Sequence, residues 1–298
     1  MTKITKAVIP VAGYGTRFLP WTKTLPKEMV PIIDRPLLHY LVEDLITSGI
    51  ETVVFVTSGN KKALEDYFDR NLELEAKLKQ AGKTKELEAI TELTEKANFV
   101  FVRQHQQLGN GHAILQGRPI TGNEPFIFAW GDEIVETSPP IFKQLIDAYA
   151  IQPGNYMSLL KAPEGKIDDW CQRYGNAQIK QLSNGICQIE KVVEKPGAGN
   201  SLSPYFTVGG FIAEPEYMDA LAQAKPGKGG EIWWNSQMDK FVAKGKVYGK
   251  IIKGDYLDMG NPLGFLTTNI HFALKNPEYK KEILAQIENE KLHNLRKL

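Results

Sequence analysis

Residues 7–17 read Ala-Val-Ile-Pro-Val-Ala-Gly-Tyr-Gly-Thr-Arg, an almost wholly apolar run that ends in a glycine-rich turn. Such a run, bounded by glycine, is typical of a strand buried on both faces. Apolar residues then recur in pairs every four positions across 37–46, and Gly49 ends this segment as a helix stop. A second apolar run follows at 52–57. These residues predict a βαβ unit, which favours a parallel sheet with a right-handed crossover.

The strand candidates change in character near residue 152. Before it, candidates lie at 99–103 and 125–130, and a mixed-charge segment at 72–96 predicts a solvated helical insertion. After it, shorter candidates separated by turn residues lie at 156–160, 177–181, 186–193 and 206–213, and we expect the sheet to become mixed there. The remaining segments are helical candidates at 231–243 and from 262 onward, with a strand candidate at 246–252 between them.

The composition describes a globular chain of 298 residues with a formal net charge of +1. An apolar fraction of 42% and a charged fraction of 24% exclude disordered, collagen-like and coiled-coil classes. A near-zero net charge argues against a protein that coats a polyanion, and no apolar stretch is long enough to span a bilayer. Cys171 and Cys187 are too few for a disulfide framework or a zinc site. We therefore expect a cytoplasmic protein without a signal peptide.

The glycine-rich turn and the loop after it carry two cations suited to phosphate. Gly13 and Gly15 let the backbone approach a ligand and point N–H groups at anionic oxygens, and Arg17 adds a guanidinium. Prolines on both sides of Lys27 hold its ammonium at low entropic cost. The segment is neither a Walker A loop nor a Rossmann fingerprint, whose third glycine would fall at Phe18. It predicts local phosphate binding, and a tight βα turn with a surface arginine is the alternative.

Two aspartates from distant parts of the chain are candidate metal ligands. Asp132 follows the apolar residues 126–130, so its carboxylate is expected at the carboxyl edge of the sheet, where open α/β sheets bind ligands. Asp258 lies in a second turn. Taken singly, each suits a turn or N-cap role. Together they would suit Mg²⁺, which takes one or two carboxylates plus substrate phosphate oxygens.

These motifs resemble the sugar-1-phosphate nucleotidylyltransferases, and most closely the bacterial UTP–glucose-1-phosphate uridylyltransferase branch. The resemblance begins with Gly-Tyr-Gly-Thr-Arg at 13–17 and Pro-Lys-Glu-Met at 26–29, and it covers nearly the whole chain. Further matching blocks lie at 103–104, 109–113, 131–132, 174–175, 193–196, 229–232 and 258–261. The resemblance implies a Rossmann-like three-layer α/β/α fold of the nucleotide-diphospho-sugar transferase type, with a mixed, mainly parallel central sheet. Each block is common alone, whereas the whole set in this order is not.

The resemblance also implies roles for individual residues. The residues implied to bind the nucleotide are Ala12, Gly13, Gly15, Thr16, Arg17, Lys27, Glu28, Gln104 and Gly109. Sugar-phosphate binding would fall to Gly175, Glu194, Lys195, Val208 and Gly209. The catalytic residues would be Arg17, Lys27, Asp132 and Lys195, with Asp132 and Asp258 as the ligands of Mg²⁺. Without the resemblance, a surface glutamine, ordinary turn glycines and an exposed Glu-Lys pair would account for several of these positions.

The reaction implied is transfer of UMP from UTP to α-D-glucose 1-phosphate, giving UDP-glucose and pyrophosphate. Two alternatives stay open: an enzyme that prefers dTTP or another sugar 1-phosphate, and a nucleotide-sugar-binding regulator without turnover. Trp233-Trp234 departs from the Gln-Leu-Thr-Asp-like stretch that is frequent in the family, so this segment either borders the sugar pocket or faces another subunit. Trp130 and Glu133 are also uncommon choices beside the metal aspartate.

The expected organisation is a single nucleotidyltransferase domain over residues 1–298. Within it we expect a nucleotide-binding half at 1–150, a sugar-phosphate-binding half at 151–260 and a C-terminal helical arm at 261–298. Ile283, Leu284 and Ile287 share one face of that arm, which would pack on the body or on another subunit. The expected partners are UTP and glucose 1-phosphate, with no nucleic acid or membrane, and a homodimer or homotetramer is implied by the resemblance.

Overall fold

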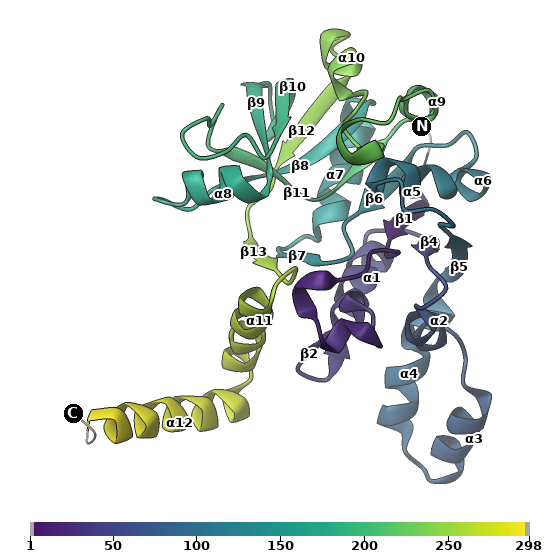
Figure 1. Ribbon diagram of the computed structural model, residues 1–298. Coiled ribbons are helices and arrows are strands. Elements are labelled where there is room, and N and C mark those ends of the chain that lie inside the picture. The colour runs from purple at the N-terminus through teal and green to yellow at the C-terminus, as the bar shows by residue number, and fades with distance from the viewer. Residues whose placement is uncertain (1–2, 296–298) are drawn as a thin grey trace.

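A single nine-stranded mixed sheet forms the centre of the computed structural model, which describes residues 3–295 (Figure 1). Its strand order is β5-β4-β1-β6-β11-β8-β12-β10-β9. The strands are β1 (Lys6–Pro10), β4 (Thr52–Thr57), β5 (Asn98–Arg103), β6 (Phe126–Ala129), β8 (Asn155–Lys161), β9 (Gly175–Gln181), β10 (Ile186–Glu194), β11 (Tyr205–Ala213) and β12 (Val247–Ile251). The sheet takes strands from both expected halves of the chain. Residues 1–2 and 296–298, which the expected halves and arm include, lie outside the described residues.

The first half of the sheet is parallel, as predicted. Strand β1 pairs in parallel with β4 and β6, and β4 pairs in parallel with β5. Helix α1 (Leu37–Thr47) connects β1 to β4, so the predicted βαβ unit is confirmed. The carboxyl ends of these four strands therefore meet at one edge of the sheet, where the glycine-rich turn and Asp132 begin.

The second half of the sheet is mainly antiparallel, which confirms the predicted mixed sheet. Strand β11 runs antiparallel to β6 and β8, and β10 runs antiparallel to β12 and β9, while β12 and β8 are parallel. The register of β11 against β8 shifts between Thr207 and Phe211, where Gly209 adopts a φ of +69°. The hydroxyl of Ser158 donates hydrogen bonds to the Val208 and Gly210 carbonyls and satisfies the irregular backbone.

Helices cover both faces of the sheet because its buried strands alternate their side chains between two cores. In β1, Ala7 and Ile9 join one apolar cluster and Val8 joins the other. The first cluster lies under α1 and α7 (Ile141–Ile151), and the second lies under α5 (Asn110–Gln116), α9 (Pro215–Ala222) and α10 (Met238–Ala243). The expected three-layer α/β/α arrangement is confirmed.

Two predicted helices differ from the structure. The segment 72–96 forms two helices, α3 (Leu72–Gln80) and α4 (Thr84–Lys96), because Gly82 turns the chain between them with a φ of +68°. They follow the short α2 (Lys62–Tyr67). The segment 231–243 is helical only in α10, because its first residues bond to the loop before α5 instead. The backbone N–H of Ile232 donates to the Leu108 carbonyl, and that of Trp234 donates to Asn110 Oδ1.

A two-stranded ribbon and several short elements are present that were not predicted from the sequence. Strands β7 (Glu133–Glu136) and β13 (Asp255–Asp258) pair antiparallel outside the main sheet and place Asp258 opposite Glu133. The short helices α6 (Arg118–Thr121) and α8 (Ile167–Arg173) and the small pair β2 (Pro31–Ile32) and β3 (Arg35–Pro36) complete the body. Among the described residues, no helix has the length and apolar character that a bilayer span requires.

The expected C-terminal arm consists of two helices, of which the first packs against the body and the second extends away from it (Figure 1). Helix α11 (Pro262–Lys275) begins beside the ribbon, and α12 (Pro277–Leu295) follows after a break at Asn276. Leu284 and Ile287 on α12 are 48% and 42% exposed, so the apolar face of this helix is open to solvent in the single chain.

Candidate active site

Two adjoining cavities form one cleft at the carboxyl edge of the parallel strands. The larger, of about 520 Å³, is lined by Arg17, Asn110, Trp130, Asp132, Glu133, Gln172, Arg173, Tyr174, Gly175, Glu194, Lys195, Thr207, Trp233, Trp234, Asp258 and Asn261. The smaller, of about 300 Å³, is lined by Pro10, Ala12, Gly13, Lys27, Glu28, Gln104, Gln107, Gly109, Asn110, Ala113, Trp130, Gly131, Asp132, Glu231 and Trp233. Asn110, Trp130, Asp132 and Trp233 belong to both. Of the predicted nucleotide residues, Ala12, Gly13, Lys27, Glu28, Gln104 and Gly109 line the smaller cavity, whereas Arg17 lines the larger one. Of the predicted sugar-phosphate residues, Gly175, Glu194 and Lys195 line the larger cavity.

Lys27 and Asp132 form an ion pair where the two cavities meet. The Lys27 Nζ lies 2.5 Å from Asp132 Oδ2, and each side chain is 24% exposed. Burial alone would raise the pKa of Asp132, but the neighbouring ammonium of Lys27 outweighs burial and holds that pKa below its ordinary value. Likewise, burial opposes the charge of Lys27, but Asp132 and then Glu28 keep its pKa above the ordinary value. Both groups are therefore charged at neutral pH.

Arg17 reaches the cleft from a tight turn that the glycines permit. It lies in a 3₁₀ turn at Thr16–Phe18, and its Nη1 donates to the Gly260 carbonyl at 3.2 Å. Gly15 has a φ of +66°, and a Cβ added there would lie 3.1 Å from the Cβ of Lys27. Gly15 and Thr16 line neither of these two cavities, so they support the cleft from behind the residues that line it.

Asp132 and Asp258 face the same small space. The ribbon places them side by side, since the backbone N–H of Met259 donates to the Asp132 carbonyl at 3.2 Å. A Cβ added to Gly260 would lie 3.0 Å from Asp258 Oδ1, 3.3 Å from Arg17 Nη1 and 3.4 Å from Asp132 Oδ2. Two carboxylates and the Arg17 guanidinium therefore converge on a position that glycine leaves open, and the carboxylate oxygens are of the kind that a hard divalent cation takes as ligands.

The hydrogen bonds of Asp258 fix its carboxylate without burying it. The Tyr174 hydroxyl donates to Oδ2 at 2.8 Å, and the backbone N–H of Gly260 donates to Oδ1 at 2.8 Å. The Nη1 of Arg173 lies 3.5 Å from Oδ2. Tyr174 comes from the loop before β9, so the second carboxylate is oriented by the same segment that bears Gly175.

Glu133 is a functional candidate that the residue-role predictions did not include. Its Oε2 accepts a hydrogen bond from the Gly209 N–H at 2.7 Å. Burial, followed by the negative charge of the adjacent Asp132, raises the pKa of Glu133 to about 8. Adjacent carboxyl groups thus have pKa values shifted in opposite directions, because only Asp132 has a cation beside it.

The structure brings Gly175, Glu194 and Lys195 together at the ends of β9 and β10. Lys195 has a φ of +47°, and its Nζ lies 3.8 Å from Glu194 Oε1. Burial raises the pKa of Glu194 although Lys195 opposes the shift. A Cβ added to Gly175 would lie 2.6 Å from Thr207 Oγ1 and 3.1 Å from Glu194 Oε2. Only glycine at position 175 leaves Glu194 and Thr207 in their present positions.

Val208 and Gly209 do not line the cavity, although both were expected to bind the sugar phosphate. The side chain of Val208 is 1% exposed and packs in the core. The N–H of Gly209 is already bonded to Glu133, and its carbonyl accepts from the Trp130 N–H at 2.9 Å. The bulge of β11 turns these two residues inward and presents Thr207 to the cavity instead. Their sugar-binding role stays a prediction, and the β11 register that separates them from Thr207 could not be read from the sequence.

One end of the smaller cavity is lined by side-chain amides. Gln104 is 7% exposed, and its Nε2 donates to the Gly109 carbonyl at 3.1 Å. The Nε2 of Gln107, a residue the sequence analysis did not single out, donates to the Ala12 carbonyl at 2.7 Å. A Cβ added to Gly109 would lie 2.6 Å from the Ile232 carbonyl oxygen, so this glycine also permits the close approach of that segment.

Three tryptophans form an aromatic wall of the cleft. Trp130 and Trp233 line both cavities and Trp234 lines the larger one. Trp234 is 3% exposed, and its ring meets that of Trp130 edge-on at a centroid distance of 6.1 Å. Of the two expectations for Trp233-Trp234, bordering the pocket is therefore the one the structure supports.

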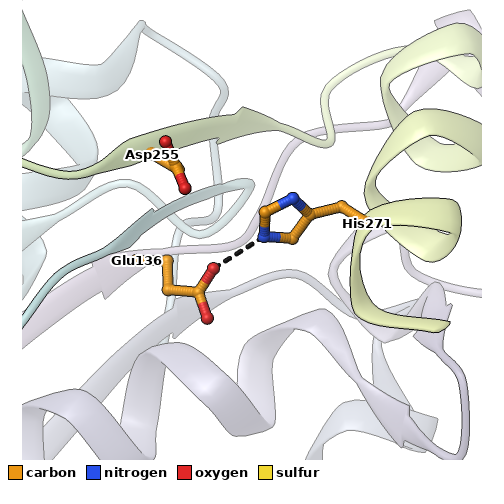
Figure 2. A group of neighbouring side chains, drawn as sticks. All are labelled: Glu136, Asp255 and His271. Atoms are coloured by element: carbon orange, nitrogen blue, oxygen red, sulfur yellow. Dashed lines mark hydrogen bonds and ion pairs between the residues drawn. The ribbon is translucent and has the colours of Figure 1, made fainter. Parts of the chain in front are cut away.

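A second charged cluster lies away from the cleft, at the far end of the ribbon. Figure 2 shows Glu136 and Asp255 on the paired strands and His271 on α11, with ligand atoms within 4.8 Å of one another. His271 Nε2 lies 2.7 Å from Glu136 Oε2, and Lys275 Nζ forms an ion pair with the same oxygen. Lys275 thus already supplies a cation here, and the cluster fastens α11 to the ribbon.

Comparison with known proteins gives consistent matches over nearly the full length. A family model described as nucleotidyl transferase matches residues 6–273. The chain is 40% identical over 98% of its length to a Staphylococcus saprophyticus protein named UTP–glucose-1-phosphate uridylyltransferase 2, of which 100% is covered. It is 39% identical over 97% of its length to a Staphylococcus epidermidis protein named UTP–glucose-1-phosphate uridylyltransferase, of which 99% is covered.

Two solved structures share the fold closely. One is a UDP-glucose pyrophosphorylase complexed with UDP-glucose, with a TM-score of 0.82, 33% identity, and 92% of this chain and 100% of that chain covered. The other is a UTP-bound UGPase from Acinetobacter baumannii, with a TM-score of 0.84, 32% identity, and 95% and 98% covered.

Proposed function

The chain belongs to the nucleotidyl transferase family, and we propose that it transfers UMP from UTP to α-D-glucose 1-phosphate, giving UDP-glucose and pyrophosphate. Relatives that carry this activity in their names match the chain from end to end. The observation that carries the proposal is the convergence of Asp132, Asp258 and Arg17 on the space beside Gly260, with Lys27 adjacent. A cleft of this kind suits two phosphate-bearing substrates that must be held against their mutual repulsion.

The proposed mechanism is in-line attack by a phosphate oxygen of the sugar phosphate on the α-phosphorus of UTP. The nucleophile is already anionic, so no general base is required. Lys27 and Arg17 would hold the triphosphate, Lys195 would hold the sugar phosphate, and Glu194 would accept hydrogen bonds from sugar hydroxyls. Gln104 would pair with the uracil edge. Because each cation approaches from a separate element, the phosphates are positioned before the reaction begins.

We propose Mg²⁺ as the cofactor, held by Asp132 and Asp258. When bound, it would neutralise phosphate charge that develops at the α-phosphorus. Asp258 is kept in place by Tyr174 and Gly260, and Asp132 is now paired with Lys27. Lys27 would then turn from this carboxylate toward the phosphates, which its flexible stem permits.

A second candidate substrate is another sugar 1-phosphate, and the aromatic wall is the observation that favours it. Trp130, Trp233 and Trp234 present ring surface to the larger cavity, where an apolar sugar face or substituent would pack. Preference for dTTP over UTP would be decided around Gln104, where a C5 methyl group must fit. The regulator without turnover is disfavoured, because a binding module has little need for two converging carboxylates.

The experiment that separates these candidates is pyrophosphate release over a grid of UTP and dTTP against several sugar 1-phosphates, with and without Mg²⁺. The proposal expects release with UTP and glucose 1-phosphate that depends on Mg²⁺. Faster pyrophosphate release with another sugar 1-phosphate would identify that compound, in place of glucose 1-phosphate, as the substrate. Binding of UDP-glucose without any pyrophosphate release would support the regulator without turnover.

The assembly we propose is a homodimer or homotetramer in the cytoplasm, where both substrates occur, with neither nucleic acid nor membrane as a partner. Its support is the exposed apolar face of α12, where Leu284 and Ile287 are open to solvent. Light scattering of the purified protein tests the assembly: a mass of one chain would contradict it.

Within the chain, we also propose that residues 1–150 bind the nucleotide and residues 151–260 bind the sugar phosphate.

A further inference from the structure

Adjacent residues of the Pro-Lys-Glu-Met block form two ion pairs that differ sharply in exposure. Lys27 pairs with Asp132 in the cleft, and Glu28 pairs with Lys61 beneath it. The Lys61 Nζ lies 2.9 Å from Glu28 Oε2, and these side chains are 3% and 1% exposed. Lys61 comes from the loop between β4 and α2, where it takes the N-cap position of α2. Lys61 is not among the residues expected from the sequence to bind a substrate or a metal.

Stability alone is a weak reason for this pair. Removing two charges from water is costly, and apolar side chains of similar volume usually fill such a site at least as well. A buried ion pair is better explained where one of its groups must remain charged and oriented. Glu28 satisfies this condition because it belongs to the cleft as well as to the pair.

Glu28 has a second carboxylate oxygen that the ion pair does not use. The residue lines the smaller cavity with Gln104 and Lys27, while its Oε1 is buried and has no hydrogen-bond partner among the described residues. A Cβ added to Gly131 would lie 3.4 Å from the Cγ of Glu28, so the Glu28 side chain also packs beneath the residue that precedes Asp132. One oxygen is therefore held by Lys61, and the other is a buried acceptor without a donor.

We propose that Lys61 is a positioning residue for the nucleotide: its ion pair orients the Glu28 carboxylate so that Oε1 accepts a hydrogen bond from the nucleoside part of UTP. Lys61 itself touches no substrate. By fixing Glu28 beneath Gly131, it also keeps the loop that bears Lys27 against Asp132. This inference rests on the proposed function, because it takes UTP as the occupant of the smaller cavity.

The test is the Lys61→Met variant, which keeps the length of the side chain and removes its charge. We expect KM for UTP to rise by about 10- to 100-fold, as for a lost hydrogen bond to a charged group, with KM for glucose 1-phosphate unchanged. Lys61→Arg should restore most of the affinity for UTP. A merely structural role would lower the amount of folded enzyme and hence the apparent kcat, with both KM values as in the wild type. That result would overturn the proposal.

A double-mutant cycle covers the case in which Lys61→Met does not fold, because Glu28→Gln with Lys61→Met leaves no unpaired buried charge. If Lys61 acts through Glu28, the double variant has the KM for UTP of Glu28→Gln alone. A further rise of about 10-fold or more above the KM of Glu28→Gln would contradict this coupling. Lys6→Met is the matched control, since it breaks a pair with Glu124 at the opposite edge of the sheet and should leave both KM values unchanged.

Direct binding separates this inference from the proposed function. UTP binding to wild type and to Lys61→Met, measured by calorimetry with Mg²⁺ present, needs no turnover. If the wild type binds UTP but releases no pyrophosphate, the proposed function fails while the comparison of affinities still tests Lys61. If the wild type turns over and Lys61→Met binds UTP equally well, only the positioning role fails.

Discussion

The two sides of the cleft are built on different structural principles. The proposed nucleotide side is lined mainly by loops that follow β1, β5 and β6, three strands of the parallel half of the sheet, and also by Glu231 and Trp233. The proposed sugar side includes the ends of the antiparallel strands β9 and β10, where Lys195 has a φ of +47°, and Thr207 beside the β11 bulge at Gly209. Parallel topology brings the loop ends of the first side together, whereas the second side depends on strand ends with irregular backbone. Single substitutions should therefore affect the two substrates separately.

The two sides of the cleft meet at Asp132 and Asp258, and each side contacts one of these aspartates. Asp132 follows β6 and pairs with Lys27 from the nucleotide side. Asp258 is held by Tyr174 and Arg173, which precede β9 on the sugar side. Loss of either carboxylate should therefore harm turnover itself, not the binding of one substrate.

The largest effect is expected for Asp132→Asn. The amide keeps the shape of the side chain but removes the charge that a divalent cation and Lys27 both need. We expect kcat for pyrophosphate release to fall by about 10³-fold or more, as for lost clamps in other phosphoryl-transfer sites. The circular dichroism spectrum should be unchanged. Release at the wild-type rate would contradict the role of this residue.

Lys27→Ala should lower kcat by about 10²- to 10³-fold, because it removes one cation that would offset the developing phosphate charge. The steady-state rate at saturating concentrations of both substrates measures this effect. Arg17→Ala, which removes the neighbouring cation in the larger cavity, serves as the comparison. Full activity of Lys27→Ala would show that its ion pair with Asp132 serves only the fold.

Gly175→Ala is the corresponding test of the sugar side. The added Cβ would displace Glu194 and Thr207, so KM for glucose 1-phosphate should rise by about 10-fold, the effect of roughly one weakened hydrogen bond. KM for UTP should remain within about twofold of the wild type, because the loops after the parallel strands are untouched. An equal rise in both KM values would break the distinction between the two sides. Gly59→Ala, outside both cavities and at a position where an added Cβ meets nothing within 4 Å, is the control for the substitution itself.

A separate effect, on stability and not on turnover, is expected from Glu133 in the pH dependence of unfolding. The pKa of Glu133 is raised to about 8, so the folded protein binds a proton here that the unfolded chain releases near pH 4.5. The free energy of unfolding should therefore decrease as pH rises between these values, by at most about 1.4 kcal/mol for each pH unit. Urea unfolding with EDTA at pH 5 and pH 8 measures this slope. Glu133→Gln should flatten it, and an unchanged slope would show that another group titrates.

The loops after the parallel strands could be placed from the sequence more readily than the rest of the cleft, for a physical reason. An apolar run followed by Gly13, or by Asp132, shows where a parallel strand ends, and topology then places its loop at the cleft. The position of Asp258 beside Asp132 depends on the ribbon of β7 and β13, whose pairing spans residues far apart in the chain. Short strands of this kind leave little periodicity to read.

The roles of Glu133 and Tyr174 depend on tertiary contacts and could not be predicted from the sequence. Glu133 accepts a hydrogen bond from Gly209, and Tyr174 donates one to Asp258. The segment 231–237 is not helical because Leu108 and Asn110 bond its backbone. Helical periodicity describes one segment at a time, so it could not anticipate this competition.

In the proposed mechanism, Asp132 and Asp258 together hold a divalent cation against the triphosphate of UTP. The most direct measurement is anomalous diffraction from crystals grown with UTP and Mn²⁺ in place of Mg²⁺. We predict an anomalous peak at about 2.1–2.2 Å from an oxygen of each carboxylate and in contact with phosphate oxygens. A peak at Glu136, Asp255 and His271 instead, with none between Asp132 and Asp258, would contradict the account.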